Sequence, residues 1–372
     1  MTGNTLGWVI VAFVLYLLMM IAIGAFYAKG NNNSEDYFLG GRKLNGFVAA
    51  LSAQASDMSG WLLMGLPGAI YLTGVGGDGW IAIGLFIGTT LNWLFIATKL
   101  RRYTIRANNS VTLPTYFENR FHDEKKVLMT VSSITIVVFF LVYCASALSA
   151  GGQLFESVFG IDYHVALTIG ALVVLVYTFL GGFTAVCVTD FIQGMLMLVG
   201  ILAVPLFAYH FLTGNGTTLA TGLEASGADS ANFLNLMKNG DGSNNIISVI
   251  SGLGWGLGYF GMPHILVRFM AVRDEKEMTK SKATAISWVA LSLGFAVFIG
   301  ILGRAYLPEL VNGNNEKVFI EMIKKVFTVE MRAPFIAGLF LCGILAAIMS
   351  TADSQLLVSA SSVAEDIFKG QI

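Results

Sequence analysis

The residues of this 372-residue sequence that could do chemistry are three aspartates inside long apolar runs, Asp57, Asp190 and Asp353. A carboxylate at the centre of a bilayer costs at least about 2.5–3.5 kcal/mol, so it usually faces a cavity or a partner. Because no lysine or arginine is expected at the same depth, a cation is the expected counter-charge. Asp190 has a second explanation, because it lies near the predicted inner end of its span and could sit in the membrane interface.

The richest polar cluster surrounds Asp353 and runs from Ser350 to Gln355. The hydroxyls of Ser350 and Thr351, together with nearby backbone carbonyls, offer hard oxygen ligands that carry little fixed charge. Such ligands suit a monovalent hard cation better than zinc or copper. Serine and threonine hydroxyls also bond back to their own helix in many membrane spans. Four polar residues and a carboxylate within six positions nevertheless favour a cation site.

Other kinds of chemistry find little support. The four histidines lie far apart and lack the spacing of metal ligands. The sequence has no GxxxxGK[ST] loop for ATP, no TVGYG potassium filter, and no nucleophile with a base on one helix. A formal net charge of −1 gives no basic excess to neutralise phosphates. We therefore expect neither an enzyme nor a nucleic-acid-binding protein, and no cofactor apart from a coupling ion.

The elements that position these residues are expected to be membrane helices. Hydrophobic residues make up 55% of the chain and charged residues 12%, whereas soluble domains carry about 25% charged residues. A chain this apolar needs the lipid bilayer as its solvent. The apolar runs predict an all-α integral membrane protein with nine spans, near 7–28, 46–73, 79–98, 128–150, 164–180, 186–211, 245–268, 284–307 and 332–362.

Basic residues predict the orientation of these spans. Sixteen lysines and arginines fall after the first, third, seventh and ninth spans, and six fall in the opposite loops. Because cytoplasmic loops carry the excess of lysine and arginine, the N-terminus is expected outside and the C-terminus inside. The segment 212–244, rich in Gly, Asn, Ser, Thr and Asp, is expected to be a solvated exterior loop.

Two of the predicted spans carry residues that interrupt a helix. The second reads SAQASDMSGWLLMGLPG from Ser52 to Gly68, and the seventh reads SGLGWGLGYFGMPH from Ser251 to His264. Close helix packing through the step Gly254–Gly258 is an alternative explanation for the seventh span. Transporters with inverted repeats, however, place such broken helices at corresponding positions of two halves, with substrate and ion between them. The expected units are an extra helix and inner loop, a first five-helix repeat, the exterior loop and an incomplete second repeat, at 1–45, 46–211, 212–244 and 245–372.

Five segments carry a resemblance to a known family: SAQASDMSGWLLMGLPGA, the region of Tyr143, GGFTAVCVTDFIQ, GWGLGYFGMPHILVRFMA and LAAIMSTADSQLL. In these segments the sequence resembles the solute/sodium symporters. The resemblance implies a LeuT-like fold of two inverted five-helix repeats preceded by one extra N-terminal helix. It also implies sodium-coupled uptake of a small solute, with L-proline as the expected solute, across a bacterial cytoplasmic membrane. The family has about thirteen helices, so this chain is expected to be truncated after about nine.

The resemblance also implies the residues of the sites. Sodium is expected at a set of carbonyls and hydroxyls: Ala55, Met58, Ala347, Ser350 and Thr351. Sodium coupling or a second ion site is expected at Asp57, Asp190, Asp353 and Ser354, with Ser350 shared. The solute pocket is expected at Ser59, Gly60, Trp61, Tyr143, Trp255, Tyr259 and Pro263. Aromatic walls suit a pyrrolidine ring, and unwound backbone can bind the carboxylate of a zwitterion.

Two alternatives remain open at this point. The solute could be another amino acid, betaine or a monocarboxylate, which competition binding would separate from proline. The chain could also be the symporter-like membrane sensor of a signalling protein, in which case a cytoplasmic kinase domain would accompany it.

Overall fold

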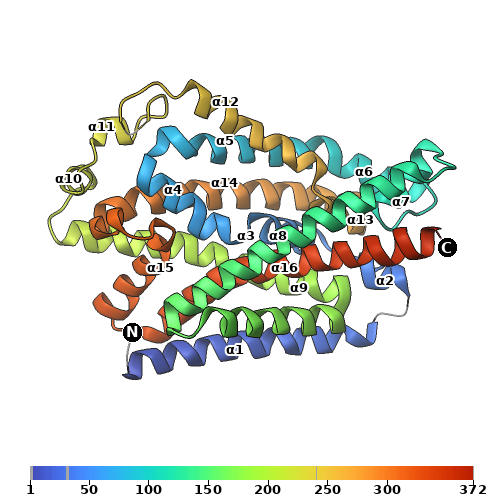
Figure 1. The fold of residues 1–372 in the computed structure, drawn as a ribbon, viewed down its shortest axis with the longest axis horizontal. Helices are drawn as coiled ribbons and strands as arrows, with labels where there is room; N and C mark the ends of the chain where they lie inside the picture. The colour runs from blue at the N-terminus through green and yellow to red at the C-terminus, as the bar shows by residue number, and fades with distance from the viewer. Residues whose placement is uncertain (1–2, 31–32, 240, 372) are drawn as a thin grey trace.

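The computed structural model describes residues 3–30, 33–239 and 241–371 as a bundle of long helices (Figure 1). Six helical segments are long and apolar enough to cross a membrane, and a bent pair of helices makes a seventh. The straight segments are α1 (Gly3–Tyr27), α5 and α6 (Val75–Leu91 and Ala97–Arg106, joined through Asn92–Ile96), α8 (Val127–Phe159), α14 (Glu275–Tyr306) and α16 (Pro334–Ser361).

The second predicted span is broken, as its sequence indicates. It consists of α3 (Gly46–Gly60), the π-helical turn η3 (Trp61–Gly65) and α4 (Leu66–Thr73). Ser59 has φ 50° and ψ −173°, which interrupts the helix at membrane depth. Its hydroxyl accepts a hydrogen bond from the Trp61 backbone N–H at 3.1 Å. A side chain therefore helps to satisfy the backbone around the break, as lipid surroundings require.

The seventh predicted span is also interrupted. α12 (Ile246–Gly254) continues into the 3₁₀ turn η5 (Trp255–Gly261), and α13 (Pro263–Ala271) follows after a bend of 47°. Met262 is extended at the bend, and Pro263, which lacks an N–H, takes the first helical position. Both helix breaks predicted from glycine and proline are thus confirmed.

Some of the glycines in this span serve packing, but at other positions than predicted. A Cβ on Gly256 would lie 2.2 Å from the Gly84 carbonyl oxygen of α5, and one on Gly252 would lie 2.7 Å from Trp80. Gly254 and Gly258 would meet nothing within 4 Å. The close helix contact therefore uses Gly252 and Gly256, because these two face α5.

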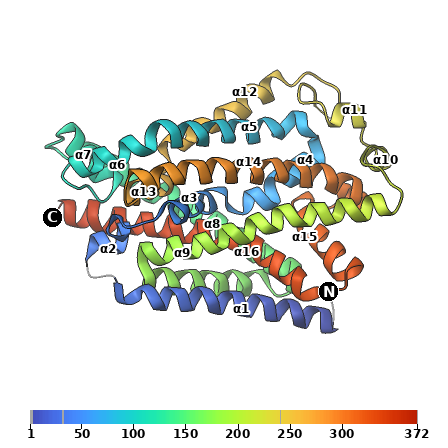
Figure 2. The same ribbon diagram turned by 180° about the vertical axis from the view of Figure 1, so that it is seen from behind.

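The helix α9 (Tyr163–Gly214) contains the predicted spans 164–180 and 186–211. Gly182 has φ 61° and ψ −161°, a conformation that glycine adopts most readily. Figures 1 and 2 show the chain turning back at this point, so that the first arm lies beside α1 and the second runs the other way. Helical segments thus occupy all nine predicted span positions within the described residues.

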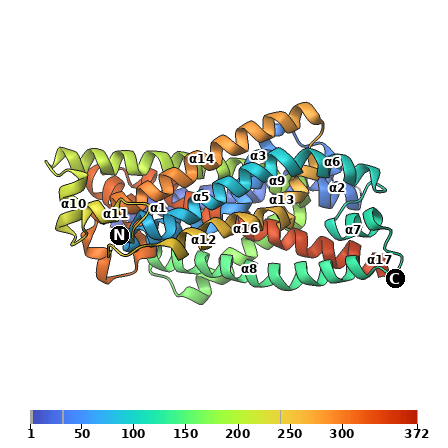
Figure 3. The same cartoon turned by 90° about the horizontal axis from the view of Figure 1, so that it is seen from above.

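Short helices cover the two ends of the bundle, as Figures 1 and 3 show. One end carries α10 (Leu219–Ala225), α11 (Ser230–Phe233) and α15 (Val318–Ile323). The segment 212–244, predicted as a loop, therefore contains two short helices. The other end carries α2 (Ser34–Leu39), α7 (Leu113–Phe121) and α17 (Lys369–Gln371). The loops richest in lysine and arginine gather at the α2 and α7 end.

Candidate functional site

A cavity of about 680 Å³ lies where the broken segment α3–η3–α4 faces α8 and η5. Six of the seven residues predicted for the solute pocket line it: Ser59, Gly60, Trp61, Tyr143, Trp255 and Tyr259. The seventh, Pro263, lines a separate and much smaller cavity. The proline lies at the first position of α13, beyond the bend, so it falls on the far side of Met262.

Aromatic rings form much of the wall of this cavity. The rings of Trp61 and Trp255 are nearly parallel, at 16°, with centroids 6.2 Å apart. Tyr259 is buried, whereas Trp255 is 53% exposed. The lining extends to Glu316, in the turn Asn315–Lys317 at the α10 and α15 end. The cavity therefore combines a flat apolar surface with an approach from that end.

Some lining residues were not predicted from the sequence. They are mostly small or polar side chains of α8 and a carboxylate near the rim, including Ser146, Ser149, Gln153, Met262 and Glu316. The α8 residues follow Tyr143 at spacings of three to ten, so a helical projection from Tyr143 would have found part of this face. Glu316 lies in an irregular segment and carries no comparable signal.

Asp57 lies at the break in α3 and lines the same cavity. Its carboxylate interacts with the Tyr259 hydroxyl, and its Oδ2 atom has no hydrogen-bond partner among the described residues. A buried acceptor without a partner is costly. The arrangement leaves one carboxylate oxygen available to a cation or to a donor group on a bound solute.

Part of the predicted sodium set meets behind the break, where α16 contacts α3. The Ser350 hydroxyl of α16 donates to the Ala55 carbonyl of α3 at 2.9 Å, and the Thr351 hydroxyl donates to the Ala347 carbonyl at 3.0 Å. Met58 is buried, and its carbonyl accepts the Trp61 N–H. Carbonyl and hydroxyl oxygens without a full charge are hard ligands that suit sodium. The Ser350–Ala55 bond joins the broken helix to α16, whereas the Thr351–Ala347 bond lies within α16.

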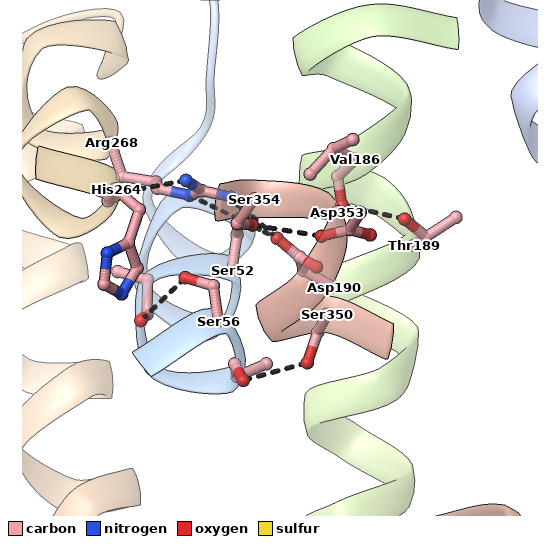
Figure 4. A network of polar contacts seen from close by, with 12 residues as sticks. Ser52, Ser56, Val186, Thr189, Asp190, His264, Arg268, Ser350, Asp353 and Ser354 are labelled. Atoms are coloured by element: carbon pink, nitrogen blue, oxygen red, sulfur yellow. Dashed lines mark hydrogen bonds and ion pairs between the residues drawn. The ribbon is translucent and has the colours of Figure 1, made fainter. Parts of the chain in front are cut away.

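A second polar network lies nearby, and it contains a base that the sequence did not predict at this depth. Arg268 of α13 forms an ion pair with Asp190 of α9 at 3.0 Å, and both side chains are fully buried. Ser52 of α3 donates to Asp190 at 2.7 Å, and Arg268 donates to Ser354 of α16 at 2.5 Å. Figure 4 shows the guanidinium between these groups. The network therefore joins four helices.

The expectation that no base neutralises the aspartates is wrong for Asp190. Arg268 was assigned to an inner loop because it ends an apolar run, but α13 continues to Ala271. Asp353 has a different environment: it accepts hydrogen bonds from Tyr177 at 2.6 Å and from Ser354 at 3.1 Å. Ser350 turns toward α3 instead (Figure 4). Asp190, Asp353 and Ser354 of the predicted second ion site therefore lie in the Arg268 network, whereas Ser350 bonds to Ala55.

The α2 and α7 end is held closed by basic side chains. Arg42 donates to the Met270 carbonyl and to the Ser110 carbonyl, both at 2.8 Å. Arg102 of α6 makes two bonds of 2.7 Å to Glu275 of α14. Burial lowers the pKa of the Arg42 guanidinium to about 10, although nearby Glu35 acts in the opposite direction. These contacts tie together several helices at the α2 and α7 end, while the lining of the cavity reaches toward the opposite end.

A bundle broken at two helices, with a solute-sized cavity and an oxygen cluster at the breaks, defines a secondary transporter in its architecture. The model of the sodium:solute symporter family matches residues 37–372, and the chain belongs to this family. It is a multi-pass membrane protein.

Relatives named sodium/proline symporter match nearly the whole chain. The Haemophilus influenzae protein is 44% identical, over 98% of this chain and 71% of that protein. The Escherichia coli protein is 44% identical over 97% of this chain and 70% of its own length, and a Staphylococcus aureus protein is 43% identical over 96% and 68%. The chain thus spans about seven tenths of the length of these relatives.

A solved structure shows the same fold. The substrate-bound, outward-open state of a Na⁺-coupled sialic acid symporter superposes with a TM-score of 0.82 at 21% identity, over 98% of this chain and 75% of that one. The LeuT-like fold class expected from the sequence is confirmed by this likeness.

Proposed function

We propose that this chain carries out sodium-coupled uptake of L-proline by alternating access. The hydrogen bond from Ser350 to the Ala55 carbonyl carries the proposal, because it sets ligand-type oxygens of α16 against the broken helix beside the cavity. Sodium bound between these oxygens would hold the break in one shape. Ordering the break would in turn favour solute binding, because Ser59, Gly60 and Trp61 lie at the break and also line the cavity.

Two observations support proline as the solute. The relatives with 43–44% identity are named sodium/proline symporters. The cavity offers parallel indole rings for an apolar ring, and the interrupted backbone near Ser59 for a carboxylate. Betaine, another amino acid or a monocarboxylate would use part of the same surface. A role as the membrane sensor of a signalling protein would use it for binding without transport.

The sodium coupling is proposed to rest on the Ala55, Met58, Ala347, Ser350 and Thr351 set, with Asp57 beside it. Asp190, Asp353 and Ser354 are proposed to act in coupling, or to hold a second ion together with Ser350. A cation at the second set must share its carboxylates with Arg268, which already pairs with Asp190. With both aspartates ionised, the group Asp190, Asp353 and Arg268 carries a net charge of −1.

The orientation is also part of the proposal. We place the N-terminus and the α10 and α15 end outside a bacterial cytoplasmic membrane, because the basic loops gather at the opposite end. In that orientation the described cavity is approached from outside and closed from inside. The division into two inverted repeats at 46–211 and 245–372 is proposed with it.

Binding of radiolabelled L-proline to the purified chain, in sodium and with choline in its place, tests this function. We expect sodium-dependent binding that the double change Ser350→Ala/Thr351→Ala abolishes. Ser292→Ala is a matched control, because among the described residues this buried hydroxyl of α14 bonds to its own helix, at Val289. Sodium-independent proline binding would contradict the coupling. Sodium-dependent binding of betaine without any binding of proline would assign a different solute, and solute binding without transport would favour sensing.

A further inference from the structure

The small cavity that contains Pro263 lies directly beyond the solute cavity. On α8, Tyr143 lines the larger cavity and Ile136 lines the smaller one, two helical turns away. On the seventh span, Met262 lines the larger cavity and the adjacent Pro263 lines the smaller one. The two cavities are therefore stacked along the same pair of helices.

The smaller cavity leads toward the α2 and α7 end. Its lining includes Phe38 of α2, Thr112–Pro114 at the start of α7, and Ser361 of α16. Its volume is only about 20 Å³, so it is closed to a solute in this conformation. Thr112 and Thr115 both donate to Asp366 and so fasten α7 to the turn that follows α16. This is the end at which the arginine contacts close the bundle.

A thin apolar barrier separates the two cavities. Ile136, Phe140 and Val358 form a small hydrophobic cluster of their own, with Val267 packed against it. The Phe140 ring meets the His264 ring edge-on, with centroids 5.4 Å apart. Phe140 lies between Tyr143 and Ile136 on α8, and His264 follows Pro263 on α13. The barrier thus contains an aromatic ring and an imidazole.

His264 is fully buried, and neither of its ring nitrogens has a hydrogen-bond partner among the described residues. Gln355 of α16 is also fully buried, and both atoms of its amide group lack a partner there. Gln355 lies one turn after Thr351 and three residues before Val358. More than about 90% of buried polar groups in proteins are paired. The His264 ring packs against Phe140 of the barrier, Gln355 stands about one helical turn before Val358 of the barrier, and neither lines a cavity in this conformation. Two buried side chains without partners among the described residues indicate groups kept for a transient ligand.

We infer that His264 and Gln355 form a transient solute-binding station on an exit route from the large cavity to the α7 end. The inference rests on the proposed function, since it assumes a zwitterionic solute. A zwitterion crossing an apolar barrier would lose its hydration at a cost of several kcal/mol per unpaired group. A neutral imidazole and an amide each offer one donor side and one acceptor side. They match the carboxylate and the ammonium group of the solute as Phe140 moves aside.

Substitutions at His264 test the station directly. His264→Leu removes both hydrogen-bonding nitrogens, whereas His264→Gln keeps a donor and an acceptor. We expect both variants to bind proline in sodium as the parent chain does. In proteoliposomes, His264→Leu should release bound proline to the α7 side about 10-fold more slowly, the effect of one lost hydrogen bond, and His264→Gln should restore most of the rate. Release at the parent rate in His264→Leu, or equally slow release in His264→Gln, overturns the station.

Cysteine labelling tests the route independently of transport. The three native cysteines are buried, so the parent chain supplies the background. Val358→Cys, in the small cavity, should react with a membrane-impermeant maleimide added from the α7 side, faster without sodium than with it. Leu356→Cys, on α16 but in neither cavity, is the control. Equal labelling of the two positions without sodium overturns the route. A parent chain that binds no proline in sodium overturns the proposed function instead, and the labelling then decides the route alone.

Discussion

The guanidinium of Arg268 lies 3.0 Å from the Asp190 carboxylate, and water reaches neither side chain. The pair joins α13 to α9, and Ser52 and Ser354 bring α3 and α16 into the same network. These four helices must separate, or move together, for the bundle to change shape around this network. The pair therefore stabilises the conformation described here.

Replacing one member of this pair should lower the free energy of unfolding more than replacing both. Arg268→Met leaves the Asp190 carboxylate buried and unpaired, which costs about 3–5 kcal/mol of the free energy of unfolding. The double variant Arg268→Met/Asp190→Asn should recover a large part of that loss. Unfolding in mixed micelles measures both. The exposed pair Arg102–Glu275 is the control, and Arg102→Met should change stability much less. Additive losses at Arg268 and Asp190 would contradict the pairing.

The glycines of the seventh span allow a test of the helix packing. Gly256→Ala places a methyl group 2.2 Å from the Gly84 carbonyl oxygen, and overpacking of this kind costs about 1–3 kcal/mol or more. Gly254→Ala meets nothing within 4 Å and should be neutral or slightly stabilising, because alanine favours helix. Melting temperatures of the two variants in detergent compare them. Equal melting temperatures would show that η5 does not approach α5 as described.

Trp255 should matter for binding more than for stability. It is 53% exposed, lines the cavity and stacks nearly parallel to Trp61. Trp255→Ala should weaken sodium-dependent proline binding by roughly 10-fold, because a buried apolar contact of this size contributes about 1–2 kcal/mol. Leu257→Ala, a neighbouring exposed residue outside the cavity, should leave the dissociation constant unchanged. Equal effects of the two changes would remove Trp255 from the site.

Asp57→Asn replaces the carboxylate at the break in α3 with a neutral side chain of the same shape. We expect a higher sodium concentration for half-maximal proline binding, since the oxygen without a partner no longer carries negative charge to attract a cation. Binding at saturating sodium should fall less than binding at low sodium. Sodium titrations of proline binding measure the change. An unchanged sodium dependence would assign Asp57 to the solute alone.

Local sequence patterns predicted most of the fold. Glycine, proline and serine in mid-span indicated both breaks, because their backbone preferences act at the positions where they stand. The same local reasoning failed for Arg268, because a charged residue at the end of an apolar run reads as a boundary. Its burial depends on Asp190 and Ser354, which are 78 and 86 residues away in the chain. Such pairing cannot be deduced from spacing along one helix.

The residues expected in the solute pocket show the same difference between what local sequence predicts and what it does not. The family resemblance implied Tyr143, Trp61 and Trp255 for the pocket, and all three line the described cavity. Pro263 was assigned to the pocket although the bend at Met262 directs it to the next cavity. The local sequence indicates a bend there but not its angle of 47°. The break in a helix is predicted readily from the residues at the break. What each half of the broken helix faces is harder to predict from the sequence.

The interruption at Ser59 also divides one helix dipole into two. Each half of a helix carries about half a unit of charge at its ends, positive at the N-terminus and negative at the C-terminus. The negative end of α3 therefore lies on the side of the Ala55 and Met58 carbonyls, and the positive start of the following half lies toward the cavity. The broken backbone can attract a cation and a carboxylate at the same depth. It does so with partial charges, which cost far less to keep inside a bilayer than ionised side chains.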